Sequence, residues 1–298
     1  MSLRLAPIVL FCYNRPVHLR QTLDSLRANT LAGESELFIF SDGPKSKLDE
    51  EQVNFVRALI RDISGFKKVV TIENPANLGL AQSVIKGVTH VIEQYGKVIV
   101  LEDDMLTTPD FLDYMNETLS VFEHRNNIFT VTGYSPPVSI PDTYHEDLYL
   151  APRASSWGWG TWKDKWEKAL WQIDHFDQLT KDESFKNKLN RGGNDLWPML
   201  WKQQKGVINS WAVRWTYTQT IHNAYGLYPV RSKLKNIGTD GSGTNFTFTS
   251  ASYGSEMDAT PVSMNADLQP DAAVIDAFRK YYDLPLPVKI KNWFKYRI

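Results

Sequence analysis

Apolar and polar residues follow a repeating pattern over the first 124 residues. Short apolar runs that are typical of buried strands lie at 7–11, 37–40, 69–72 and 98–101. After each run, apolar residues recur every three or four positions, which is the spacing of one helix face. These helical stretches cover 16–27, 49–64, 80–95 and 109–124. Strands that alternate with helices predict an α/β fold with a mostly parallel central sheet flanked by helices.

The second half of the chain has a different pattern. Strand signals become sparse, prolines and glycines interrupt the sequence, and residues 246 to about 271 are polar and loop-like. We therefore expect a domain over 1–245, built from 1–132 and 133–245, and a C-terminal extension over 246–298 that packs on it.

An acidic triplet, Glu102, Asp103 and Asp104, directly follows the strand at 98–101. Three carboxyl groups at the end of a buried strand repel one another and lose solvation, which is costly unless a cation or several donors lie there. Hard divalent cations take oxygen ligands and share them with substrate phosphates, so the triplet suits a metal on a diphosphate. The alternative is that the acids belong to a loop that caps the helix beginning at Pro109.

Two other predicted strands also end in polar residues, at 13–15 and 41–43. Ligands on parallel sheets bind outside the carboxyl ends of the strands. Arg15, Asp42 and Asp103 are therefore expected to line one edge. No glycine-rich loop between a strand and a helix matches a phosphate-binding pattern, so a metal and basic side chains would have to neutralise a diphosphate.

Composition excludes several classes of protein. The chain has 298 residues, 42% hydrophobic and 22% charged, and a formal net charge of −1, which describes an ordinary globular protein and argues against a nucleic-acid binder. Cys12 is the single cysteine, so there is no disulfide framework, which fits a reducing compartment. No segment approaches the length of a transmembrane helix. We expect a cytoplasmic protein or one attached peripherally to a membrane.

Tryptophan is concentrated in one region, because nine of the ten lie between Trp157 and Trp215. Indole faces can stack on sugars, but large aromatic side chains more often belong to the core. Three pairs of tryptophans lie four residues apart, namely 162 and 166, 197 and 201, and 211 and 215. That spacing places each pair on one helix face and favours core positions for at least half of them.

The last ten residues, 289–298, alternate basic with apolar or aromatic residues and contain no acid. Such a tail suits an anionic membrane surface. The alternative is a final helix docked on the domain.

Three segments, 11–16, 77–80 and 98–104, resemble the nucleotide-binding half of GT-A glycosyltransferases. The chain is most similar to bacterial family 2-like sugar transferases related to the eukaryotic alpha-1,3-mannosyl-glycoprotein N-acetylglucosaminyltransferase. The resemblance covers about residues 5–245, and its most specific pieces are 101–104 with 109–111, 157–162 and 236–244. It implies a GT-A fold in which 1–132 bind the nucleotide and 133–245 face the acceptor.

The resemblance also implies roles for individual residues. Asp104 would be the direct metal ligand for Mn²⁺ or Mg²⁺, Asp103 would face the ribose or a metal-bound water, and Glu102 would approach the donor sugar. The residues implied in nucleotide binding are Phe11, Tyr13, Arg15, Asp42, Asn77, Gly79 and Leu80. The residues implied near the donor sugar and acceptor are Trp157, Gly158, Trp159, Trp211 and Arg214. Arg231, Lys233 and Lys235 are further candidates to supply positive charge.

Two positions depart from the family pattern. Relatives commonly have His where this chain has Asn245, whose carbonyl oxygen remains a candidate metal ligand. Relatives tend to have Asp where this chain has Asn209, and an inverting transferase needs a carboxylate to take the acceptor proton. Asp195 and Asp240 are the remaining candidates for the catalytic base, and Asp240 is preferred because it lies in the family-like segment.

The function that these observations imply is a metal-dependent, inverting hexosyl- or N-acetylhexosaminyltransferase of bacterial surface polysaccharide synthesis. It would move a sugar from a nucleotide-diphosphate donor, with uridine as the expected base, to a glycan or lipid-linked acceptor. The expected location is the cytoplasm or the inner membrane face. One alternative is a carbohydrate-binding homologue that has lost turnover. Another is a sugar-phosphate nucleotidyltransferase, but this would need a glycine-rich loop that 14–17 do not provide.

Overall fold

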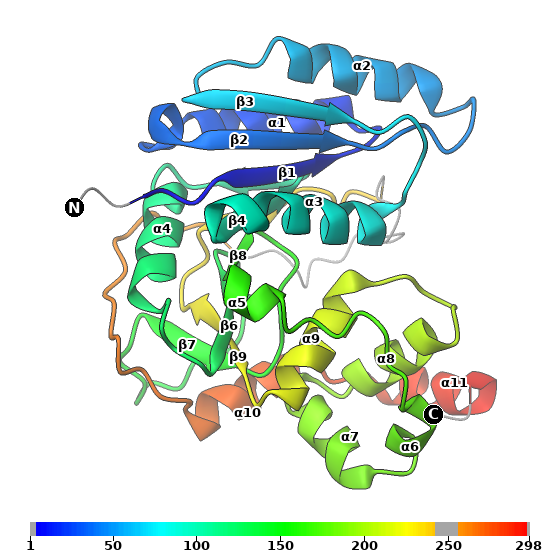
Figure 1. The fold of residues 1–298 in the computed structure, drawn as a ribbon. Helices are drawn as coiled ribbons and strands as arrows, with labels where there is room; N and C mark the ends of the chain where they lie inside the picture. The colour runs from blue at the N-terminus through cyan, green and yellow to red at the C-terminus, as the bar shows by residue number, and fades with distance from the viewer. Residues whose placement is uncertain (1–3, 242–255, 297–298) are drawn as a thin grey trace.

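The computed structural model describes residues 4–241 and 256–296, and its first half is a parallel sheet covered by helices (Figure 1). The parallel strands, in spatial order, are β3 (Lys68–Glu73), β2 (Glu36–Ser41), β1 (Ile8–Cys12) and β4 (Lys97–Glu102). The helices between and after them are α1 (Pro16–Arg27), α2 (Glu50–Arg61), α3 (Leu80–Tyr95) and α4 (Phe111–Val121). The α/β class is confirmed, and each predicted strand and helix of this half is present with ends that differ by a few residues at most.

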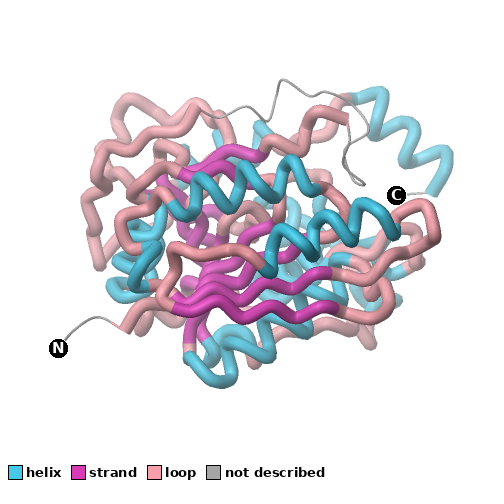
Figure 2. The backbone as a smooth tube through the Cα atoms, turned by 90° about the horizontal axis from the view of Figure 1, so that it is seen from above, coloured by secondary structure: helices cyan, strands magenta, loops and turns pink. Residues whose placement is uncertain are grey.

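Both faces of this sheet are buried because the side chains of each strand alternate between them. In β1, Ile8 and Leu10 pack with apolar residues of α1, α2 and α4, whereas Val9 and Phe11 pack on the other face with α3. Figure 2 shows the strands side by side with helices over them.

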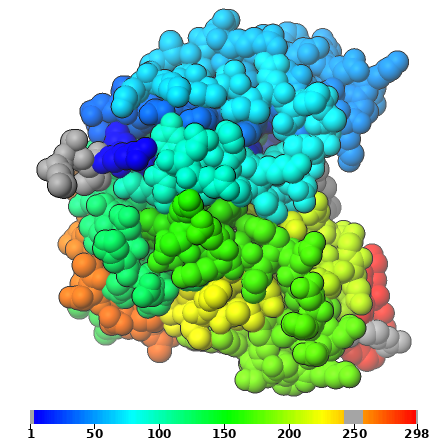
Figure 3. Space-filling model, in the orientation of Figure 1, coloured from blue at the N-terminus to red at the C-terminus, as the bar shows by residue number. Residues whose placement is uncertain are grey.

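The second half of the chain extends the same sheet instead of forming a separate one. The full order is β3-β2-β1-β4-β8-β6-β9-β7. The added strands are β6 (Ile128–Thr132), β7 (Leu148–Ala151), β8 (Trp159–Trp162) and β9 (Tyr225–Pro229). β8 runs antiparallel to both β4 and β6 and joins the two halves. The space-filling view likewise shows the early and late residues in continuous contact (Figure 3). The division of the domain into 1–132 and 133–245 and the C-terminal extension over 246–298 stay predictions.

Helices of the second half form a second, smaller core beside the sheet. They are α6 (Phe176–Leu179), α7 (Glu183–Leu189), α8 (Leu196–Gln204) and α9 (Trp211–Ile221). The short helix α5 (Lys163–Trp166) instead packs Trp166 into the core layer beneath α3. 3-10 turns lie at Ala32–Glu34, in the first half, and at Asn190–Gly192. Near the C-terminus, α10 (Ala272–Tyr281) packs Val274 and Phe278 against Tyr149 and Tyr228, and α11 (Leu286–Tyr296) follows it. Among the described helices, none combines the length and apolar character that a bilayer span requires.

A two-stranded sheet places a late segment next to the acidic triplet. β5 (Met105–Thr107) pairs antiparallel with β10 (Leu234–Asn236), with Asn236 opposite Met105. The residues that follow β10 are thereby held beside the carboxyl end of β4.

Candidate functional site

The polar strand ends of the first half meet at one edge of the sheet. Because β1, β2 and β4 are parallel neighbours, residues 13–15, 42–43 and 102–104 all follow strands that end at this edge. The backbone N–H of Tyr13 donates to Asp103 Oδ2 at 3.2 Å, and Arg15 Nη1 donates to Asp104 Oδ2 at 2.8 Å. The structure therefore brings these residues together as the sequence predicts.

Helix α1 fixes the backbone of the triplet. The Thr22 hydroxyl donates to the carbonyl oxygen of Asp103 at 2.9 Å and accepts from the N–H of Met105 at 3.1 Å. Thr22 is fully buried, so these bonds hold the turn between β4 and β5 in one conformation.

The Asp104 carboxylate is covered by the segment that follows β10. Its Oδ2 accepts from Arg15, and its Oδ1 accepts from Asn236 Nδ2 at 3.1 Å. Ile237 N–H donates to the Asp104 carbonyl at 2.8 Å. A Cβ atom at Gly238 would lie 2.0 Å from Asp104 Oδ2, so only glycine allows the chain to pass this closely.

Asp240 lies at the same place and is linked to helix α1. His18 Nε2 is 3.1 Å from Asp240 Oδ2, and Arg15 Nη2 is 3.7 Å from Asp240 Oδ1. His18 was missed by the sequence reasoning. Its position one helical turn after Arg15 is the signal that would have found it, since residues three apart share a helix face.

The three carboxyl groups are short of positive charge. Burial, followed by the neighbouring carboxylates of Asp104 and Asp103, raises the pKa of Glu102 well above its usual value. Burial and the Asp104 carboxylate raise the pKa of Asp103 to about 7. Burial raises the pKa of Asp104 as well, although Arg15 opposes the effect. One arginine therefore does not balance the cluster, and an additional cation would favour the ionised forms.

Asp42 is buried and holds the loop before α3 in place. Its carboxylate accepts from the backbone N–H groups of Gly43 at 3.0 Å, Leu78 at 2.9 Å and Gly79 at 2.9 Å. Asn77 Nδ2 adds a bond of 2.9 Å to the Gly43 carbonyl. These contacts hold the loop before α3 against the turn that follows β2, and Leu80 at its end is 37% exposed. The loop, more than the Asp42 carboxylate, is available to a nucleoside.

Several residues expected to contact nucleotide or sugar belong to the core instead. Phe11 stacks on Phe40 with ring centroids 5.4 Å apart. Trp159, which is 0% exposed, stacks on Trp211 at 4.8 Å. The reason is that alternate positions of β1 and β8 point into the layer beneath α3 and α9, where large rings fill the space.

The buried Arg214 is also held inside the second half. Its Nε donates to the Ser210 carbonyl at 3.1 Å, and its Nη2 donates to Asn209 Oδ1 at 3.2 Å. Trp157 is buried as well, in the same core cluster as Leu234 of β10, and a Cβ atom on Gly158 would lie 1.9 Å from a side-chain carbon of Leu234.

Asp195 is an ion-pair partner and not a free base. Its two oxygens accept from Nη1 and Nη2 of Arg153 at 2.7 and 2.8 Å, and the Arg153 guanidinium lies 3.9 Å from the centre of the Tyr282 ring. The role of Asp195 as a catalytic base stays a prediction, and its 15% exposed side chain in a bidentate pair is less accessible than the 48% exposed side chain of Asp240.

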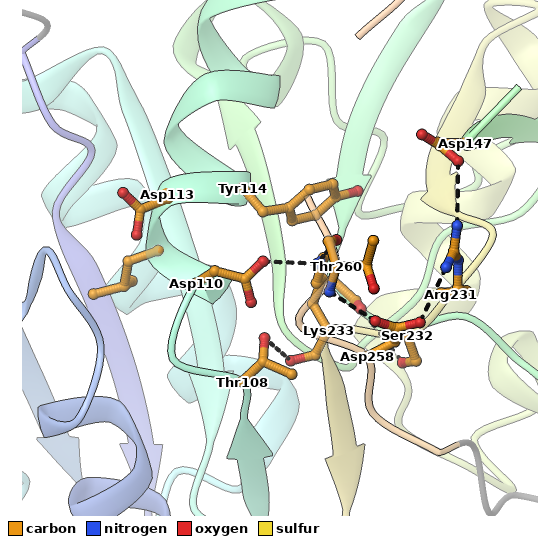
Figure 4. Close-up of polar contacts among 12 residues, drawn as sticks. Thr108, Asp110, Asp113, Tyr114, Asp147, Arg231, Ser232, Lys233, Asp258 and Thr260 are labelled. Atoms are coloured by element: carbon orange, nitrogen blue, oxygen red, sulfur yellow. Dashed lines mark hydrogen bonds and ion pairs between the residues drawn. The ribbon is translucent and has the colours of Figure 1, made fainter. Parts of the chain in front are cut away.

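The expected phosphate-binding cations Lys233 and Arg231 have internal partners (Figure 4). Lys233 is 1% exposed, and its Nζ donates to Asp110 Oδ2 at 2.7 Å and to the Thr260 carbonyl at 2.6 Å. Arg231 lies 3.3 Å from Asp258 in an ion pair. These contacts attach the chain after residue 256 to β10 and to the start of α4.

The expected metal ligand Asn245 lies outside the described residues. Within 4–241 and 256–296, no group of three or more His, Cys, Asp or Glu side chains has an arrangement that would hold a metal ion.

Comparisons with known proteins agree with the motifs. A family model described as GNT-I family matches residues 2–188. An alpha-1,3-mannosyl-glycoprotein 2-beta-N-acetylglucosaminyltransferase from Arabidopsis thaliana is 25% identical over 201 residues, which cover 61% of this chain and 44% of the relative. The match thus spans less than half of the relative's length.

Similar solved structures include a mannosyltransferase and the S. aureus protein TarS. The mannosyltransferase PcManGT from Pyrobaculum calidifontis, solved with GDP-Man and Mn²⁺, has a TM-score of 0.39 and 13% identity, with 55% of this chain and 48% of that chain covered. TarS 1-349 from S. aureus has a TM-score of 0.43 and 7% identity, with 79% of this chain and 61% of that chain covered.

Proposed function

This chain belongs to the GNT-I family, and on that premise we propose that it is a glycosyltransferase that moves a sugar from a nucleotide-diphosphate donor to a glycan or lipid-linked acceptor. The family resemblance inferred from the sequence motifs is confirmed. The observation that carries the proposal is the convergence of Tyr13, Arg15 and the acidic triplet at one sheet edge, where parallel α/β sheets bind ligands. A uridine nucleotide, inversion at the anomeric carbon and a cytoplasmic setting in surface polysaccharide synthesis complete the proposal.

The residues at this edge have the oxygen atoms that a divalent cation takes as ligands. Carboxylate oxygens are ligands for hard cations. Burial raises the pKa values of Asp103 and Asp104, and for Asp103 the neighbouring Asp104 carboxylate raises it further, so a cation at this edge would favour the ionised forms. Asp104 now accepts bonds from Arg15 and Asn236, so binding of Mn²⁺ or Mg²⁺ would replace at least one of these contacts. When bound, the cation would stabilise the charge that develops on the leaving diphosphate.

Arg15 then has a second role in the proposal. Its guanidinium, once released from Asp104, remains at the strand edge and can form paired bonds with phosphate oxygens. The side chain is 15% exposed, so it can reach a ligand without unfolding α1.

Asp240 is the proposed catalytic base. Its side chain is 48% exposed, and it lies on the segment that covers Asp104. His18 orients the carboxylate through its 3.1 Å contact. An acceptor hydroxyl would transfer its proton to Asp240 as it attacks the donor sugar. Trp159 and Trp211, which the alternative of a sugar-binding protein without turnover would use, are 0% and 3% exposed and offer no face for stacking on a sugar.

The test is calorimetry of UDP and GDP with and without Mn²⁺, followed by an assay of donor hydrolysis. We expect nucleotide binding that depends on the cation. Asp104→Asn should abolish that dependence and lower turnover at least about 100-fold, the scale of losing one electrostatic group at a reacting centre. Asp62→Asn, on the exposed end of α2, is the matched control. Full activity of Asp104→Asn, or glycan binding that ignores nucleotide and metal, would contradict the proposal.

A further inference from the structure

Helix α11 is attached to the protein along a narrow strip only. Of its eleven residues, Asn292 alone is buried, at 5% exposure. Asn292 Oδ1 accepts from Lys202 Nζ of α8 at 3.1 Å, and the Tyr296 ring packs on Trp201 with centroids 5.5 Å apart. The residues at 286–291 and 293–295 are exposed.

The outward surface of α11 carries an apolar stripe. Leu286, Ile290 and Phe294 are spaced four apart, which places them on one face, and they are 69%, 48% and 68% exposed. Trp293 beside them is 52% exposed. An isolated helix of this length is only marginally stable in water, and a contiguous exposed apolar stripe indicates an interaction surface. We call this surface, formed by Leu286, Ile290, Trp293 and Phe294, the α11 stripe.

The charges around the α11 stripe have one sign. Lys289, Lys291 and Lys295 lie on the helix, and no acidic residue occurs from 284 to 298. Lys202 of α8 and Lys205, which follows its last residue, add positive charge beside Tyr296 and Trp201. This local excess contrasts with the formal net charge of −1 for the whole chain.

A second copy of the chain fits this surface poorly. The helix is roughly 16 Å long, and a stripe about 10 Å wide offers far less than the roughly 800 Å² per partner of a stable protein interface. Two such helices would also bring their lysines together. A layer with anionic head groups above apolar chains complements both the charge and the stripe.

We propose that α11 docks on an anionic lipid bilayer, with the α11 stripe in the acyl boundary and its lysines at the head groups. The proposal stands on the helix alone and does not need the proposed transferase activity. Figures 1 and 2 place α11 on the side of the molecule toward which β1, β2 and β3 run. Docking would therefore bring the sheet edge with the acidic triplet near the membrane surface, which suits a lipid-linked acceptor if the proposed function holds.

The test is co-sedimentation of the full chain with vesicles of phosphatidylcholine alone or mixed with phosphatidylglycerol. We expect binding to the mixed vesicles only, and release as salt is raised. Ile290→Ser/Phe294→Ser should lower the partition coefficient at least about tenfold, because two buried apolar side chains are lost. Lys291→Gln/Lys295→Gln should lower it about fivefold for each lysine.

Matched controls separate the stripe from general surface effects. Phe55→Ser removes a 55% exposed aromatic residue from α2, and Lys86→Gln/Lys181→Gln removes two exposed lysines elsewhere. These variants should bind as the wild type does, and circular dichroism should show that all variants are folded. Failure of the wild type to bind mixed vesicles overturns the proposal, as does equal loss in the controls. Self-association that Ile290→Ser/Phe294→Ser removes, without vesicle binding, would instead assign the stripe to a second copy.

Discussion

The acidic edge of the first half and the tryptophan-rich second half both look functional in the sequence. The structure places the acidic residues at the ends of strands but buries most of the tryptophans in the core. The carboxylates of Asp103 and Asp104 meet Tyr13 and Arg15 at the strand ends. The indoles of Trp159 and Trp215 are 0% exposed inside the molecule. In this protein, position relative to the sheet edge predicts a site better than residue type does.

The difference has a physical cause. An indole gains free energy from burial once its N–H finds an acceptor. Trp215 Nε1 donates to Thr130 Oγ1 at 2.7 Å, and Trp162 Nε1 donates to the Leu119 carbonyl at 2.8 Å. Carboxylates lose free energy when they are buried, so their accumulation at the end of β4 requires a compensating partner. The tryptophans stabilise the fold, whereas the buried carboxylates cost free energy unless they are protonated or paired with a cation.

The largest expected effect follows from truncating a buried indole. Trp159→Ala should lower the free energy of unfolding by about 3–5 kcal/mol, because the cavity adds to the lost apolar burial. Urea denaturation measures the change. Trp293→Ala, at a 52% exposed position, should change it by less than about 1 kcal/mol. A Trp159→Ala protein of normal stability that loses only sugar affinity would reverse the contrast between the two regions.

A pH-dependent effect is expected at the acidic edge. The pKa of Asp103 is raised from 3.8 to about 7 by burial and by Asp104, so the folded protein prefers the protonated carboxyl. Without added cation, Asp103 ionises in the unfolded chain from about pH 4 but keeps its proton in the folded protein until about pH 7, so stability falls across this range and stays lower above it. Asp103→Asn should be more stable than the wild type at pH 8 by up to about 4 kcal/mol, and the difference should vanish near pH 4.

Thermal denaturation across this pH range measures the difference. A constant offset between Asp103→Asn and the wild type at every pH would show that the carboxyl is not held in its protonated form.

Substitution of Asp195 should mainly lower stability, whereas substitution of Asp240 should mainly lower turnover. Asp195→Asn breaks a mostly buried bidentate pair with Arg153 and should cost about 3 kcal/mol of stability. Asp240→Asn, at a half-exposed site, should cost less than about 1 kcal/mol of stability but should remove turnover. Denaturation and a transfer assay on the same preparations test both. Turnover lost in folded Asp195→Asn and kept in Asp240→Asn would reverse the assignment.

The last prediction concerns the reactivity of Cys12, which lies between the buried core and the candidate site. Cys12 closes β1, and burial together with the Asp103 charge raises the pKa of its thiol well above its usual value. Its reaction with a disulfide reagent should be slower by on the order of 100-fold in the native protein than in urea, because the thiolate is rare and covered. Rapid native labelling would place Cys12 in the accessible site instead.

The sequence by itself determined the first half of the fold. Alternating apolar runs and helical periodicity located all four strand-helix units and placed Tyr13–Arg15 and the triplet at one edge, because these patterns depend on neighbouring residues only. Motifs within short segments likewise identified the family that the comparison confirms over residues 2–188.

Only the tertiary structure decided which residues cover that edge and which go inside. The contacts of Asp104 with Asn236 and of His18 with Asp240 join positions 132 and 222 residues apart, and no local pattern encodes them. The same holds for β8, which is short and fully buried and therefore shows no alternation of polar and apolar residues. Local periodicity reports on a segment's own faces, whereas the partner of each face is chosen when the whole chain packs.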